Sequence, residues 1–197
     1  YWADFRDPWL NARNYGIPFL SPQQMKEEIQ KAASLLKEGN VVAIPTETVY
    51  GLAANAFNED AVRKIFEIKD RPLFNPLIIH IKSLAFLEQL VYNIPPKALQ
   101  LAHHFWPGSL TLILPKKEIV PNIITAGKNT VAVRVPNHPV TLALLTALDF
   151  PLAAPSANPF GTISPTEAKH VTDYFKEKIP MVLDGGICQN GIESTII

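Results

Sequence analysis

Cysteine and glycine are scarce in this sequence. Its single cysteine, Cys188, excludes an intrachain disulfide and a zinc site built from several cysteines. Glycine occurs 9 times against 18 prolines, and neither Gly-x-Gly-x-x-Gly nor Gly-x-x-x-x-Gly-Lys-Ser/Thr is present. Because these are the two best-known phosphate-binding loops, a bound nucleotide would have to be held by side-chain cations instead.

Long apolar runs and an excess of one charge are missing as well. No stretch approaches about 18 uninterrupted apolar residues, so no membrane span is expected. Asp4, Arg6 and Asp7 lie among aromatic residues, which is not a signal-peptide pattern, and we expect a cytoplasmic protein. The 18 Lys and Arg residues balance 18 Asp and Glu residues. This balance argues against a global electrostatic grip on nucleic acid, although a local basic patch would be compatible with it.

The 197 residues, 47% of them apolar, fit one domain over residues 21–197 preceded by an N-terminal extension over residues 1–20. The extension either packs across the domain or is a partly ordered leader. Capping patterns at Ser21 and Ser164 and periodic apolar residues predict the elements. The predicted helices are 22–37, 58–69, 84–90, 95–105, 138–148 and 165–175, and the predicted strands are 41–44, 77–81, 110–114, 130–135, 152–154, 181–183 and 194–197. Helices and strands do not alternate strictly, which favours an α/β fold with a mixed, twisted sheet.

Two pairs of polar residues follow predicted elements. Lys69 and Arg71 come just after a helix; arginine can fork onto two phosphate oxygens and lysine acts as a point charge, so they could bind an anion. The alternative is a solvated helix end. Ser156 and Asn158 stand between prolines after a buried strand. They offer a hydroxyl and an amide to a ligand, or they form a turn by bonding their own backbone.

Arg134 and the histidines allow more than one interpretation. A cation in a buried strand needs an anionic partner, and for Arg134 this is either a ligand carboxylate or a distant acid. His80, alone in an apolar strand, is interpreted as a satisfied core residue. His103, His104 and His138 lack metal-ligand spacing and are interpreted as structural or surface residues. No serine lies in a nucleophile-elbow pattern and Cys188 has no evident partner base, so covalent catalysis is not indicated.

Seven motifs occur together in a fixed order. They are Pro-Thr-Glu-Thr-Val-Tyr-Gly-Leu (45–52), Lys-x-Arg-Pro (69–72), Asn-Pro-Leu-Ile-Ile-His (75–80), Trp-Pro-Gly-Ser-Leu-Thr (106–111), Val-Ala-Val-Arg-Val-Pro (131–136), Pro-Ser-Ala-Asn (155–158) and Glu-Ser-Thr-Ile (193–196). In this order they resemble the YrdC-like family of threonylcarbamoyl-AMP synthases. The resemblance covers roughly residues 24–197.

The resemblance implies a twisted mixed sheet with flanking helices around a large, positively charged cavity. It implies that L-threonine, bicarbonate and ATP are converted to threonylcarbamoyl-adenylate and pyrophosphate, normally with Mg²⁺. The adenylate would then serve a separate threonylcarbamoyltransferase complex that modifies the adenosine next to the anticodon of certain tRNAs. Direct tRNA contact has little support from the sequence.

The family's functional positions carry over residue by residue. The threonine-binding positions match Thr48, His80, Arg134, Ala154 and Ser194, and the ATP-binding positions match Arg71, Asn75, Thr130, Ser156 and Ser164. The catalytic signatures Lys-x-Arg and Ser-x-Asn match Lys69, Arg71, Ser156 and Asn158; the metal ligands stay unassigned.

Two departures from the family pattern matter. Asp70 replaces the glycine usual between the lysine and the arginine, which adds a negative charge beside the phosphate site. The sequence ends at Ile197, before the segment where a further ATP-contacting arginine is expected and where longer members carry a second domain. Two other functions fit parts of the pattern: a YrdC-like carbamoyltransferase domain that uses carbamoyl phosphate, and a non-enzymatic RNA-binding module.

Overall fold

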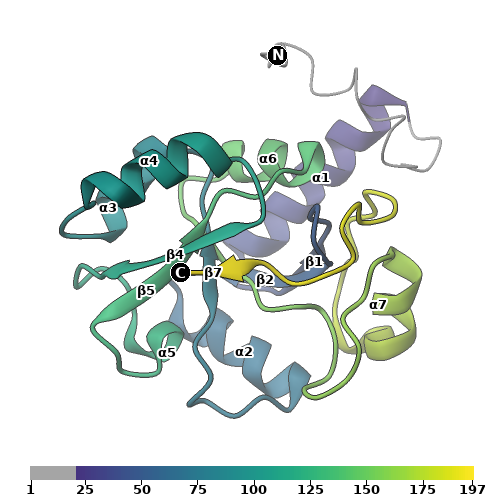
Figure 1. The fold of residues 1–197 in the computed structure, drawn as a ribbon. Helices are drawn as coiled ribbons and strands as arrows, with labels where there is room; N and C mark the ends of the chain where they lie inside the picture. The colour runs from purple at the N-terminus through teal and green to yellow at the C-terminus, as the bar shows by residue number, and fades with distance from the viewer. Residues whose placement is uncertain (1–20) are drawn as a thin grey trace.

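The structure, a computed structural model, describes residues 21–197; the predicted extension at residues 1–20 lies outside the described residues. Figure 1 shows the chain as a central sheet with helices on either side. The helices are α1 (Pro22–Lys37), α2 (Glu59–Lys69), α3 (Leu84–Leu90), α4 (Pro96–Phe105), α5 (Asn122–Thr125), α6 (Pro139–Thr146) and α7 (Ala168–Phe175), followed by a 3-10 turn at Lys176–Lys178. The strands are β1 (Val42–Ile44), β2 (Gly51–Asn55), β3 (Ile78–His80), β4 (Leu110–Pro115), β5 (Thr130–Arg134), β6 (Leu152–Ala153) and β7 (Thr195–Ile196).

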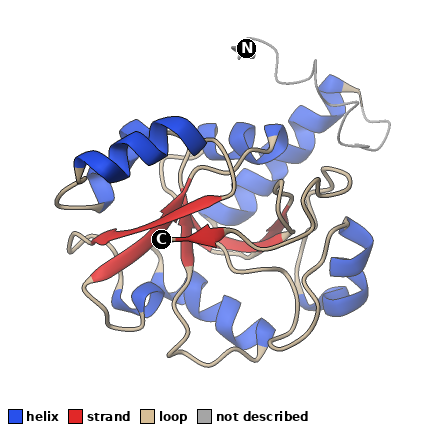
Figure 2. Cartoon of the chain, in the orientation of Figure 1, coloured by secondary structure: helices blue, strands red, loops and turns tan. Residues whose placement is uncertain are grey.

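The sheet has seven strands in the order β1-β2-β6-β3-β5-β4-β7. The pairs β3–β5 and β4–β7 are parallel and the other neighbours are antiparallel, so the sheet is mixed. Figure 2 shows helices covering the sheet from above and below in that view. The predicted fold class, a mixed and twisted α/β sheet with flanking helices, is therefore confirmed. None of the described helices is long and apolar enough to span a bilayer.

Local signals place the first two helices as predicted. The Ser21 hydroxyl accepts a hydrogen bond from the Gln24 amide at 3.2 Å, and the Gln24 side chain accepts one from the Ser21 amide at 2.8 Å, which completes the capping box. The Asn58 side chain accepts from the Ala61 amide at 3.1 Å and caps α2. Helix α2 ends at Asp70, whose backbone is left-handed with φ of 50°.

The prediction missed β2 and misplaced the start of α7. Gly51–Asn55 was assigned to no element, because its small residues carry no β-branched signal; in the fold it is a buried strand between β1 and β6. The predicted helix cap at Ser164 is wrong. Helix α7 begins only at Ala168, since the Ser164 hydroxyl donates to Glu193 Oε1 at 2.6 Å and the Pro165 carbonyl accepts from the Tyr50 amide at 2.8 Å.

Smaller differences concern the edges of the sheet. Residues 181–183 form an isolated bridge, Val182 to Ala43, instead of a strand. The short helix α5 was not predicted. His138, interpreted as structural or at the surface, is buried at the start of α6, which agrees with the structural interpretation. These segments depend on contacts with distant parts of the chain, which the local sequence does not contain.

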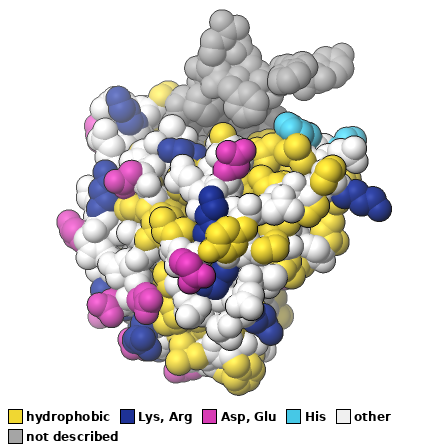
Figure 3. Space-filling view, turned by 90° about the vertical axis from the view of Figure 1, so that its left-hand side faces the viewer, with side chains coloured by type: hydrophobic (Ala, Val, Ile, Leu, Met, Phe, Trp, Pro, Cys, Tyr) yellow, Lys and Arg dark blue, Asp and Glu magenta, His cyan; other side chains and the backbone are white. Residues whose placement is uncertain are grey.

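Two apolar clusters hold the layers together. One packs α2, α3 and α4 against the sheet, and the other packs α1 and α6 against β1, β2 and β6. In the parallel pair, Ile79 is in register with Val133, and both are fully buried in the first cluster. Their neighbours His80 and Arg134 are also in register, so they project together from the opposite face. Figure 3 shows one side of the molecule, on which cations and anions are interspersed among apolar side chains.

Candidate functional site

A cavity of about 300 Å³ lies where five segments of the described chain meet. These are the turn at residues 46–51, the loop that leads into β3, the end of β5, the loop after β6 and the segment at residues 193–196. Seven residues predicted to bind threonine or ATP line the cavity: Thr48, Arg71, His80, Arg134, Ala154, Ser156 and Ser194. Two arginines and the carboxylate of Glu193 are the charged groups of its lining.

Three other predicted ATP-site residues do not line the cavity. The Ser164 hydroxyl donates to Glu193, and the Asn75 carbonyl accepts from Arg71 Nε at 3.4 Å. Thr130 begins β5 opposite Pro115 of β4, two positions before Ala132. Ala132 pairs with Ile78, which lines the cavity. Asn75 and Ser164 therefore contact residues of the cavity wall, whereas Thr130 is connected to it only through the register of β5 and β3.

Lys69 points into the protein instead of into the cavity. Its side chain is buried, and its amine donates to the backbone carbonyls of Ser156 and Asn158. Burial, with a further contribution from the charge of Arg71, lowers the pKa of Lys69 to about 7. Lys69 thus holds the turn that presents Ser156 to the cavity.

In the Ser156–Asn158 turn, the Asn158 side chain makes hydrogen bonds to the neighbouring backbone, as the structural interpretation of this residue predicted. The Asn158 amide donates to the carbonyls of Pro159 at 3.2 Å and Thr162 at 2.7 Å. Asn158 does not line the cavity, whereas Ser156 does. The turn therefore has a structural member and a cavity-facing member, two residues apart.

Arg134 finds its anionic partner in a distant part of the chain. Its Nη2 atom lies 3.2 Å from Glu47 Oε2, and both Nη atoms donate to Thr48 Oγ1 at 3.1 Å. Burial lowers the pKa of Arg134, and the Glu47 carboxylate opposes this effect. The sequence allowed either a ligand carboxylate or a distant acid as the anionic partner of Arg134, and the structure shows the distant acid, Glu47. Sequence reasoning missed Glu47; the signal was an isolated carboxylate directly after a buried strand.

His80 is buried in its apolar strand as expected, and its ring has a backbone hydrogen bond with Ile78, but the ring is only partly satisfied. Burial, followed by the charge of Arg134, lowers the pKa of His80 well below its usual value, so the ring is neutral. Its Nδ1 atom is buried without a hydrogen-bond partner among the described residues. Arg134 Nε is unpaired in the same way, and both residues line the cavity. Buried polar groups are normally paired, so two unpaired nitrogens beside one cavity indicate a ligand site.

The segment after Cys188 closes one side of the cavity. Strand β7 pairs with β4, and Ser194 Oγ lies 2.8 Å from Thr111 Oγ1. Glu193, which lines the cavity, was not among the predicted site residues. It sits directly before Ser194 in the Glu-Ser-Thr-Ile motif, which is the signal that could have found it.

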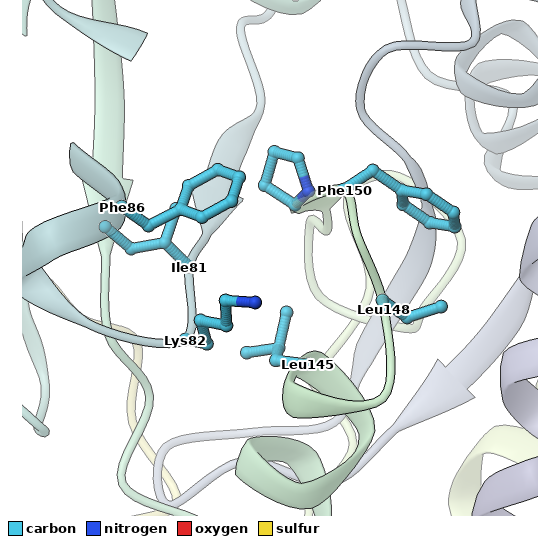
Figure 4. Close-up of a pocket in the computed structure, with 7 residues that line it drawn as sticks. Ile81, Lys82, Phe86, Leu145, Leu148 and Phe150 are labelled. Atoms are coloured by element: carbon cyan, nitrogen blue, oxygen red, sulfur yellow. The ribbon is translucent and has the colours of Figure 1, made fainter. Parts of the chain in front are cut away.

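Other hollows of the described chain are less suited to a ligand. The crevice in Figure 4, between Phe86 and Phe150, has no room for a water molecule and is lined mainly by apolar side chains. A second cavity of about 300 Å³ lies between α1 and residues 182–184 and carries carboxylates without a cation. No group of three or more His, Cys, Asp or Glu side chains in residues 21–197 could hold a metal ion.

Comparison with known proteins identifies several relatives. The chain is 55% identical over 170 residues to a threonylcarbamoyl-AMP synthase of Pyrococcus abyssi, covering 86% of this chain and 50% of the relative. It is 52% identical over 171 residues to the threonylcarbamoyl-AMP synthase of Bacillus subtilis, covering 86% and 49%. The chain thus spans about half the length of these relatives.

A solved structure shows the same fold. The crystal structure of Pyrococcus abyssi Sua5 complexed with L-threonine matches with a TM-score of 0.85 at 55% identity, over 86% of this chain and 50% of that one. A family model described as "Telomere recombination" matches residues 34–197. Since that match extends over most of the sequence, the chain belongs to the Sua5–YciO–YrdC family.

Proposed function

We propose that this chain is the catalytic part of a threonylcarbamoyl-AMP synthase, an ATP-dependent nucleotidyltransferase that makes threonylcarbamoyl-adenylate and pyrophosphate from L-threonine, bicarbonate and ATP. The observation that carries the proposal is the paired presentation of His80 and Arg134 to one cavity, each with a buried nitrogen that has no partner among the described residues. The names of relatives at 55% and 52% identity, one of which was crystallised with L-threonine, point to the same substrates.

In the proposed threonine pocket, Arg134 binds the carboxylate. Its Nε–H is buried and unpaired among the described residues, and a carboxylate acceptor there would satisfy it. The neutral His80 ring offers a donor or an acceptor to the small polar side chain of threonine. Thr48, Ser194 and Ala154 complete the wall; the two hydroxyls are already oriented by Arg134 and Thr111.

The proposed ATP site uses the remaining predicted residues. Arg71 lies on the cavity wall and carries the positive charge for the phosphates, while Ser156 supplies a hydroxyl donor. Asn75 and Ser164 contact the wall residues Arg71 and Glu193, and Thr130 is proposed to complete the site. Lys69 contributes through the turn that it holds.

The reaction needs charge neutralisation and alignment above all. Threonine and bicarbonate give a carbamate and water. A carbamate oxygen then forms a bond to the α-phosphorus of ATP as the bond to the bridging oxygen of pyrophosphate breaks. Both reactants are anionic, so a cavity with Arg71 and Arg134 lowers the cost of bringing them together. The carbamate is already an anion, and this step needs no general base.

Magnesium is proposed to enter with ATP. The described residues form no metal site of their own, and Mg²⁺ is commonly held by one or two carboxylates together with substrate phosphates. Glu193, on the cavity wall, is the carboxylate placed to take part. When bound, Mg²⁺ would neutralise charge on the phosphates of the leaving pyrophosphate.

The product is proposed to pass in the cytoplasm to a threonylcarbamoyltransferase complex that modifies tRNA. The two other functions are less well supported. The curated relatives described above are named as synthases, not as carbamoyltransferases. The balanced composition gives an RNA-binding module no excess of positive charge.

Pyrophosphate release tests the proposal. With ATP and Mg²⁺ present, release should require both L-threonine and bicarbonate, and omission of either should abolish it. Release that ignores threonine, or activity only with carbamoyl phosphate, would contradict the proposal. Tight, salt-sensitive binding of bulk tRNA without any turnover would favour the RNA-binding module.

A further inference from the structure

We infer that Glu47 is a positioning residue that fixes the Arg134 guanidinium for a ligand carboxylate. The inference rests on the proposed function and adds to it a residue outside the predicted site. Glu47 does not line the cavity; it lies behind Arg134, with its side chain only 4% exposed. It therefore acts on a ligand only through another residue.

Three donors bind the Glu47 carboxylate. Oε2 accepts from Arg134 Nη2 at 3.2 Å and from the backbone N–H of Asn137 at 2.9 Å, and Oε1 accepts from Ser109 Oγ at 3.3 Å. The Glu47 backbone is also held, because its carbonyl accepts from the Asn190 amide at 2.8 Å. These three donors and the anchored backbone fix the position of the Glu47 carboxylate.

This fixed carboxylate determines the orientation of the guanidinium. Arg134 makes its side-chain hydrogen bonds to Glu47 and Thr48, which are adjacent in the chain. They take Nη1 and Nη2 and leave the Nε edge of the planar group without a partner among the described residues. Because arginine binds carboxylates through a rigid fork, a rotation of the guanidinium would move its donors away from the ligand.

The same contacts connect the pocket to the segment that closes it. Ser109 Oγ, which donates to Glu47, accepts from Asn190 Nδ2 at 2.8 Å. The Thr48 carbonyl accepts from the Gly191 amide at 3.0 Å. Residues 47 and 48 thus hold both Arg134 and the start of the segment that carries Ser194. Loss of the Glu47 carboxylate should affect recognition of the threonine carboxylate more than recognition of ATP.

The test compares the affinities of L-threonine and L-threoninol, in which an alcohol replaces the carboxylate. Both are titrated calorimetrically into wild type, Glu47→Ala, Glu47→Gln and, as a control at an exposed position, Glu118→Ala. Wild type and the control should prefer threonine by at least about tenfold, on the scale of one good charge-assisted contact. Glu47→Ala should reduce this preference to within about threefold, with the KM for ATP unchanged. Glu47→Gln, which keeps the shape and can still accept from Arg134, should restore most of it.

The outcomes separate the possible explanations. A purely structural role would lower the melting temperature of Glu47→Ala or weaken both ligands equally, and either result with an unchanged threonine preference would overturn the inference. If wild type itself does not distinguish threonine from threoninol, the proposed function fails and the inference about Glu47 falls with it.

Discussion

Replacement of Arg134 should separate the stability of the fold from recognition of threonine. Arg134→Met removes the cation and leaves the Glu47 carboxylate buried, with the Asn137 amide and the Ser109 hydroxyl as its remaining donors. Breaking one partner of a buried ion pair costs about 3–5 kcal/mol. Because two donors survive, we expect the free energy of unfolding to fall by about 3 kcal/mol, near the lower end of that range.

The double variant Arg134→Met with Glu47→Gln removes both charges. Replacement of a buried pair by neutral groups of similar shape is often neutral in stability, so most of the lost free energy of unfolding should return, to within about 1 kcal/mol of wild type. Threonine affinity should not return. Loss of the partner of a bound carboxylate should cost about 2–4 kcal/mol in both variants, a weakening of roughly 30-fold or more.

Urea unfolding measures the first quantity and calorimetric titration of L-threonine the second. Recovery of threonine affinity together with stability in the double variant would mean that the single variant bound poorly because its fold was distorted. It would also mean that Arg134 does not hold the carboxylate. Unchanged stability in Arg134→Met would show that the Glu47–Arg134 pair contributes nothing measurable.

Three further predictions follow from the same structure. Arg71→Ala should slow pyrophosphate release, with an activation free energy about 2–4 kcal/mol higher, and should change the melting temperature little. Lys69→Ala should lower both the rate and the melting temperature, because two backbone carbonyls lose their donor. An unchanged melting temperature in Lys69→Ala would contradict this. Burial lowers the pKa of His138 to about 4. The unfolded chain therefore binds a proton between pH 6.5 and 4 that the folded chain does not, so the free energy of unfolding should fall by up to about 1.4 kcal/mol per pH unit as the pH drops through this window; His138→Asn should show a shallower slope in urea unfolding. Serine should bind more weakly than threonine by about 1 kcal/mol, the contribution of one methyl group. Valine should bind more weakly still if the pocket makes a hydrogen bond to the threonine hydroxyl. Equal affinities of threonine and valine in calorimetric titration would mean that the pocket lies elsewhere.

The sequence predicted those features whose signals are local. Helices α1 and α2 begin at capping residues that contact their own first turns, and both were located within one residue. Ser164 carries the same local pattern, but a hydrogen bond to Glu193 and the anchoring of Pro165 by Tyr50 replace the cap. Strand β2 was missed because its burial between two neighbours, not the propensity of its residues, makes it a strand.

The candidate site divides in the same way. Seven residues of the cavity wall were named through family motifs, whereas Glu193 on the wall and Glu47 behind Arg134 were missed. Glu47 and Arg134 are 87 positions apart, and no local sequence pattern predicts that they form an ion pair. A polar residue was predictable where it ends a buried strand; its partner was predictable only once the register of β3, β5 and the turn at residues 46–51 was known.

Asp70 shows how one backbone position gives the Lys-x-Arg spacing its use. The sequence suggested two neighbouring cations for one phosphate site, with Asp70 as an unfavourable charge between them. In the fold, Asp70 is the left-handed residue at the end of α2, with φ of 50° and its side chain exposed. A reversal of backbone direction at this point sends Lys69 inward to the Ser156–Asn158 turn and leaves Arg71 on the cavity wall. Glycine suits a left-handed helix end best and aspartate tolerates it, so the substitution keeps the geometry on which both cations depend.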